Sequence, residues 1–169
     1  MASTYEPIAS TTLGGSASTI DFTSIAGSWT DLRLIISPVV SSATTIGIRV
    51  GNSSVDTGSN YSSTFLYGTG SSAASARVSS QTILRVSYAA TARTTNDGGD
   101  VIVDLMSYAS TSVYKTVLAQ GGIASEGVDR IVGLWRSTSA ITEISVLPVS
   151  GGSILASGMT ASLFGIKAA

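Results

Sequence analysis

Cysteine and histidine are both absent from this chain of 169 residues. Without cysteine there is no disulfide framework and no thiolate chemistry. Without histidine the chain lacks the commonest metal ligand and the commonest general base at neutral pH. A Ser-His-Asp triad is therefore excluded, and we expect neither a metal nor a cofactor to take part in the function.

Charged side chains are also scarce, at 11% of the chain, against about 25% in an ordinary soluble domain. The net charge of −1 leaves no basic patch, so we expect no nucleic acid or anionic lipid among the partners. No apolar run approaches the roughly 18 residues of a membrane-spanning helix. The first residues also lack the basic and apolar regions of a signal peptide, so we expect a protein made and kept in a cytoplasm.

In place of charged residues the chain is rich in serine, threonine and short apolar runs. The runs alternate apolar and polar residues and are separated by clusters of Gly, Ser, Asn and Asp, which is the pattern of β-strands and turns. The length fits one domain over residues 1–169. About eleven strands are predicted, at Ile8–Leu13, Ser18–Phe22, Leu32–Ser37, Ile46–Val50, Tyr61–Tyr67, Thr82–Tyr88, Val101–Met106, Val113–Ala119, Val128–Trp135, Ile141–Leu147 and Thr160–Ile166.

This many short strands in one domain predicts an all-β, antiparallel β-sandwich, with a jelly roll as the favoured topology and a barrel as the alternative. Asn96–Gly99 has the composition of a hairpin turn between two strands. Gly68–Ala76, rich in Ser, Ala and Gly, is the predicted mobile loop. We expect at most one helical turn in Ala73–Val78.

A Ser-Lys dyad is possible by count, but neither Lys115 nor Lys167 lies in a recognisable catalytic context. Paired carboxylates could also support catalysis, as in glycoside hydrolysis. Asp97, Asp100 and Asp104 lie close in sequence, and Asp100 and Asp104 share one face of a predicted strand. A solvated strand face explains them better, because a hydrolase also needs a cleft lined with aromatic residues, and these are only 7% of the chain. Asp56–Tyr61 resembles a calcium loop but lacks its terminal Glu, so we interpret it as a turn. We therefore predict that the protein is not an enzyme.

The aromatic residues are more informative as packing groups. Trp29 precedes a predicted strand, and Trp135 ends another and is followed by Arg136. Trp, Tyr and Arg are the residues that dominate protein–protein hot spots. Trp29, Tyr67, Trp135 and Arg136 are therefore the candidate protein-interface residues, with the pair Trp135 and Arg136 as the first choice.

The order of several segments resembles a jelly-roll module of structural proteins in tailed bacteriophages, notably those of cyanobacteria and marine bacteria. The matching segments are Ile20–Ile25, Trp29–Leu34, Gly47–Val50, Asp56–Ser62, Leu66–Gly68, Tyr114–Val117, Gly133–Thr138 and Ser162–Lys167. The resemblance implies a protein of the virion, assembled in the host bacterial cytoplasm. It also implies a homo-oligomer, with a trimer as the candidate stoichiometry, and other virion proteins as partners.

Two functions fit this resemblance. The first is a capsid decoration, or cement, protein that packs against the major capsid protein and acts without catalysis. The second is a head- or tail-fibre adhesin that binds a host surface glycan, with Tyr67 and Trp135 as candidate contacts. The chain has no long shaft or coiled-coil segment, which favours the compact decoration protein.

Overall fold

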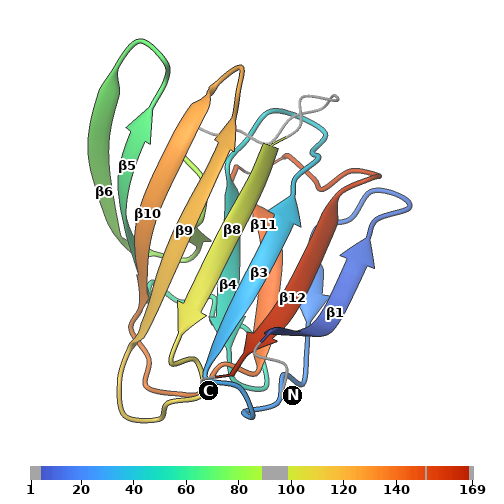
Figure 1. The fold of residues 1–169 in the computed structure, drawn as a ribbon, viewed down its shortest axis with the longest axis vertical. Helices are drawn as coiled ribbons and strands as arrows, with labels where there is room; N and C mark the ends of the chain where they lie inside the picture. The colour runs from blue at the N-terminus through green and yellow to red at the C-terminus, as the bar shows by residue number, and fades with distance from the viewer. Residues whose placement is uncertain (1–4, 89–98, 151, 168–169) are drawn as a thin grey trace.

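The computed structural model describes residues 5–88, 99–150 and 152–167, and these form a sandwich of two antiparallel β-sheets (Figure 1). No helix occurs in these ranges, and hence none long and apolar enough to cross a membrane. The strands are β1 (Tyr5–Thr12), β2 (Ile20–Phe22), β3 (Asp31–Ser37), β4 (Ile46–Gly51), β5 (Tyr61–Gly68), β6 (Ala73–Gln81), β7 (Leu84–Arg85), β8 (Gly99–Met106), β9 (Lys115–Ile123), β10 (Gly127–Trp135), β11 (Glu143–Pro148) and β12 (Thr160–Ile166).

The two sheets differ in size. The large sheet has eight strands in the order β1-β12-β3-β8-β9-β10-β5-β6, and the small sheet has four in the order β2-β11-β4-β7. Figure 1 looks onto the large sheet, with the small sheet behind it. The predicted all-β sandwich of antiparallel strands is confirmed.

The strand pairing is nested along the chain. β1 pairs with β12, β2 with β11, β3 with β8, and β4 with β7. Such nesting of early strands with late ones is what a jelly roll of eight strands requires. The other four strands form two hairpins, β5–β6 and β9–β10, which are inserted after β4 and β8 and pair with each other through β5 and β10. These hairpins widen the large sheet on one side only.

The core lies between the sheets because alternate residues of each strand point inward. On β3 the side chains of Leu32, Leu34 and Ile36 are fully buried, and Arg33 faces outward between them, as the alternation predicts. β11 is buried almost along its length, and it lies inside the small sheet, between β2 and β4.

Two overlapping predictions are wrong. The mobile loop at Gly68–Ala76 and the helical turn at Ala73–Val78 are instead the end of β5, a tight turn and most of β6. In the turn the N–H of Thr69 donates to the carbonyl of Ser72 at 3.0 Å. Alanine and serine carry little strand preference of their own, so pairing with β5 determines the structure here.

Two further predictions differ in extent. The predicted strand Thr82–Tyr88 contains only the two-residue β7. The predicted turn Asn96–Gly99 lies outside the described residues except for Gly99, where β8 begins. The other ten predicted strands match the observed elements to within a few residues.

Trp29 closes one end of the sandwich. Its indole ring lies directly against the backbone of Gly165 on β12, where an added Cβ would overlap several ring atoms. The Trp29 backbone N–H donates to the Tyr108 hydroxyl at 3.3 Å, and its indole N–H donates to Glu6 at 3.4 Å. Only a glycine at position 165 leaves room for this ring.

We expect Gly165→Ala to destabilise the protein by about 2 kcal/mol, because the ring or the strand must move to admit the methyl group. Urea unfolding measures this change. Gly14→Ala is the matched control, since nothing lies within 4 Å of a Cβ at Gly14. Equal stability of the two variants would contradict the role assigned to Gly165.

Candidate interaction surface on the large sheet

The outer face of the large sheet turns away from the small sheet and carries exposed aliphatic side chains on the inserted hairpins. Four of them form what we call the aliphatic patch: Leu66 on β5 (60% exposed), Leu118 on β9 (42%), and Val128 and Val132 on β10 (64% and 54%). Exposed apolar side chains that occur singly are ordinary on protein surfaces, but a cluster is characteristic of interaction sites.

The strand register places these side chains next to one another. Val132 lies directly opposite Leu118 on the neighbouring strand. Leu66 lies opposite Arg130 and is therefore diagonal to both Val128 and Val132, a separation that long side chains can bridge. The patch is continuous across β5, β10 and β9.

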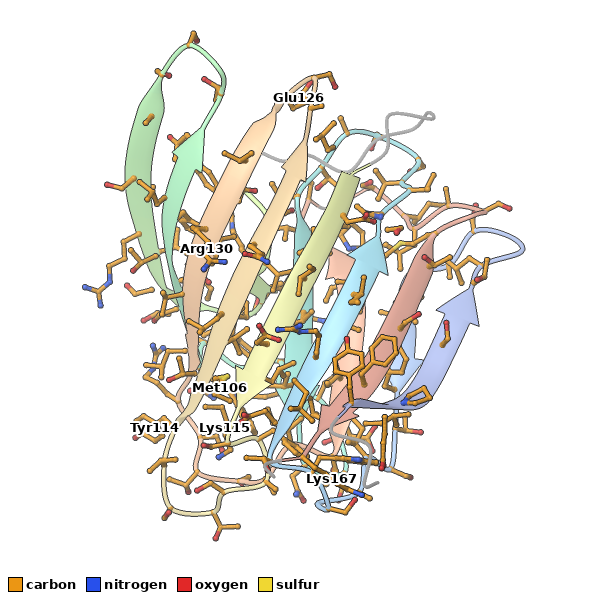
Figure 2. The ribbon with its side chains drawn as sticks, in the orientation of Figure 1. Met106, Tyr114, Lys115, Glu126, Arg130 and Lys167 are labelled. Carbon is orange, nitrogen blue, oxygen red and sulfur yellow. The ribbon has the colours of Figure 1, made fainter. Side chains whose placement is uncertain are left out.

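Arg130 lies in the middle of the patch. Its side chain is on the face toward the viewer in Figure 2 and donates a hydrogen bond from Nη1 to Oε1 of Gln120. An Arg surrounded by aliphatic side chains is a common arrangement at the centre of protein interfaces.

Two hollows flank Arg130. The larger, about 810 Å³, lies where Gly68 and Gly122 face outward beside Val128, with Asp100 on its far side. A Cβ on Gly122 would come within 3.3 Å of Val128 Cγ1, so the glycine keeps this hollow open. The smaller hollow, about 410 Å³, lies among Leu66, Leu118 and Val132. Both could receive apolar side chains from a partner.

The carboxylates that could support hydrolysis have structural partners. Asp104 receives two hydrogen bonds from Arg33, from Nε at 2.6 Å and from Nη2 at 3.0 Å. The same hydrogen bonds to Asp104 raise the pKa of Arg33. Asp100 shares the outer face with Asp104, as predicted, and accepts a hydrogen bond from Ser37. Asp97 lies outside the described residues.

Lys115 is the one fully buried amine in the described part of the chain. Nζ donates to the carbonyls of Val113 at 2.8 Å and Thr138 at 3.1 Å, so it fixes two loops at the lower end of the sheet in Figure 2. Burial lowers the pKa of Lys115. No group of three or more carboxylates that could hold a metal ion occurs in the described ranges.

Trp135 and Arg136, the first-choice contact pair, make contacts within the chain. Trp135 is only 3% exposed, and its indole N–H donates to Oδ2 of Asp56 at 2.8 Å. Arg136 donates to Ser62 Oγ at 2.5 Å and to the Ser59 carbonyl at 2.7 Å. Both side chains fix the loop before β5, and Trp135 leaves almost no surface for a partner.

The other two candidates are also directed inward. Tyr67 faces the interior of the sandwich and packs on Tyr88, with ring centroids 4.8 Å apart. Trp29 packs against β12, which β3, β8 and β9 separate from the Trp135 strand. The structure does not bring the four candidates together, and the interface prediction for them stays a prediction.

A signal for the aliphatic patch is present in the sequence. Phe65-Leu66, Val117-Leu118 and Ile131-Val132 are adjacent apolar pairs inside strands. Successive residues of a strand point to opposite faces, so each pair places one apolar side chain in the core and one on the outer face. Such pairs in three neighbouring strands indicate an apolar outer face.

Asp56 organises the loop before β5 as a turn. Besides the Trp135 indole, it accepts hydrogen bonds from the Gly58 N–H at 2.7 Å and the Asn60 amide at 2.9 Å. Burial alone would raise the pKa of Asp56, but the hydrogen bonds from Trp135, Asn60 and Gly58 outweigh it, so the pKa lies below its ordinary value of 3.8. The turn predicted at Asp56–Tyr61 is confirmed.

We expect Asp56→Asn to lower stability by about 2 kcal/mol at neutral pH, since hydrogen bonds to a charged acceptor are lost. The folded-state pKa is the lower one, so the stabilisation is complete above 3.8 and is lost as the pH falls through the folded value. Urea unfolding between about pH 7 and about pH 2 should show the gap between wild type and variant closing on acidification.

Glu143→Gln is the control for this experiment, because among the described residues the Glu143 carboxylate accepts one long bond, of 3.5 Å, from the Ser24 N–H. A gap for Asp56→Asn that stays constant with pH would contradict the assigned role of the Asp56 carboxylate.

Comparison of the sequence with protein-family models gave no match, and comparison with curated proteins identified no relative. The membership in a phage structural family that the segment order implies therefore stays a prediction. The outer face of the inserted hairpins is the candidate functional surface on geometric grounds.

Proposed function

We propose that this protein is a structural component of a bacteriophage particle, a capsid decoration protein that packs the outer face of its large sheet against neighbouring virion proteins. The observation that carries the proposal is the aliphatic patch with Arg130 at its centre. The nested strand pairing supports the jelly-roll part of the resemblance. In this role the protein catalyses no reaction and is localised to the virion.

The size of the patch suits an association that is repeated many times. Fully burying one Leu or Val side chain contributes about 2 kcal/mol. About half of each of the four side chains of the patch is exposed in the free protein. Only that half remains to be buried, so covering the patch contributes on the order of 4 kcal/mol per copy. This free energy corresponds to a dissociation constant of about 1 mM for one isolated contact. A symmetric particle presents many such sites at once, and this strengthens the overall attachment.

We expect the double variant Val128→Lys/Val132→Lys to fold normally, because both side chains are exposed. It should lose attachment to the particle, because two charges would be buried against the partner. Particles stripped of the protein are mixed with wild type or variant and heated until they release DNA. Wild type should raise the release temperature, and the variant should leave it at the value for bare particles.

Thr12→Lys/Ser157→Lys is the matched control, since it adds the same two charges at exposed positions outside the patch. It should behave like wild type. An equal release temperature for bare particles and particles carrying wild type would contradict the cement role itself.

The alternative, a glycan-binding fibre module, has one supporting feature. Asp100, Gln120 and Arg130 line the larger hollow and offer donors and acceptors for sugar hydroxyls. Tyr67 and Trp135 face inward, so Arg130→Ala is the informative variant. Binding of wild type on a glycan array that Arg130→Ala abolishes, together with labelling at fibre tips in electron micrographs, would replace the decoration role.

A further inference from the structure

The two outermost strands of the large sheet present different edges. β1 contains Pro7 and an irregular register between Pro7 and Ala9, both of which obstruct pairing with another strand. β6 runs for nine residues without a proline, and its side chains are mostly exposed. Its own irregularity lies near its end, between Val78 and Gln81, and leaves Ala73–Val78 in regular register with β5. Figure 1 shows β6 at the far left of the sheet.

The edges of the small sheet are short. β2 has three residues and β7 has two, which is too few for a stable added ladder. Among the edges that the described residues form, the Ala73–Val78 part of β6 is therefore the longest stretch without a proline or a bulge.

The hairpin turn determines which backbone groups of β6 face outward. Thr69 and Ser72 are hydrogen-bonded across the turn, and hydrogen-bonded pairs alternate along an antiparallel ladder. Ala74, Ala76 and Val78 therefore bond to β5, in register with Tyr67, Phe65 and Ser63. By the same alternation, the residues between them, Ala73, Ser75 and Arg77, direct their N–H and C=O groups away from β5.

We propose that β6 pairs antiparallel with β6 of a second copy of this chain, joining two large sheets into one continuous sheet across a two-fold axis. A strand paired antiparallel with its own copy is self-complementary, as a two-fold interface requires. The side chains beside the outward groups are small at Ala73 and Ser75, so a second backbone can approach.

Arg77 restricts the register of the pair. Identical charges directly opposite each other destabilise a strand pair, which excludes a register that centres on Arg77. Centring on Ser75 places Ser75 opposite its copy and Arg77 opposite Ala73. This register forms three hydrogen-bonded residue pairs, each of which exchanges two N–H···O bonds.

The pairing has a consequence for the aliphatic patch. The two-fold axis of an antiparallel pair is perpendicular to the sheet, so both outer faces point the same way. Leu66 lies on β5, next to β6, and the dimer therefore presents two patches side by side to one partner surface. This consequence rests on the proposed function, whereas the dimer does not. The dimer also replaces the trimer suggested by the resemblance.

Amide hydrogen exchange of the wild-type protein, measured by NMR, tests the edge directly. Ala74, Ala76 and Val78 exchange slowly in monomer and dimer alike because they bond to β5. We expect Ala73, Ser75 and Arg77 to exchange slowly as well at about 1 mM protein and to accelerate on dilution. Fast exchange at these three amides at every concentration would overturn the proposal.

Ser75→Pro removes an outward N–H and leaves the ladder to β5 intact. Light scattering after size exclusion should give a dimer for wild type and for the control Ser75→Ala, and a monomer for Ser75→Pro with an unchanged circular dichroism spectrum. A folded, dimeric Ser75→Pro would overturn the proposal. If Ser75→Pro does not fold, the exchange experiment on the wild-type protein decides the question. Neither measurement involves a particle, so failure of the dimer is distinguishable from failure of the decoration role.

Discussion

Where the inserted hairpins widen the large sheet, its strands carry apolar side chains on both faces, and the chain covers only one of them. Phe65, Val117 and Ile131 point into the core, and Leu66, Leu118 and Val132 point out. Burial of the inner set stabilises the fold by the hydrophobic effect. The outer set gives no comparable stabilisation as long as the molecule is isolated, because these side chains stay exposed. Association with another surface is the simplest reason for their presence.

The nested strands and the inserted hairpins have separate tasks in this account. The eight nested strands form the sandwich and supply most of its core, and the inner faces of β5, β9 and β10 extend that core. The hairpins β5–β6 and β9–β10 add the patch, the two hollows and the β6 edge. Internal hydrogen bonds of Trp135, Arg136 and Asp56 fix the loop from which β5 starts, and β5 carries Leu66 of the patch.

Much of the fold could be predicted from alternation alone. Leu32, Leu34 and Ile36 identify an inner face without any structure, because a strand repeats every two residues. β6 could not be predicted in this way, since its Ala and Ser residues adopt a strand only through pairing with β5. The candidate surface was missed for a different reason. Large aromatic residues suit cores and interfaces equally well, and here Trp135 and Tyr67 are used inside the chain.

An image of the intact particle at subnanometre resolution tests the central claim most directly. The account predicts that the outer face of β5, β10 and β9 lies against a neighbouring protein, with Arg130 enclosed and the small sheet toward solvent. A particle in which this face is open to solvent and the small sheet makes the contacts would contradict it.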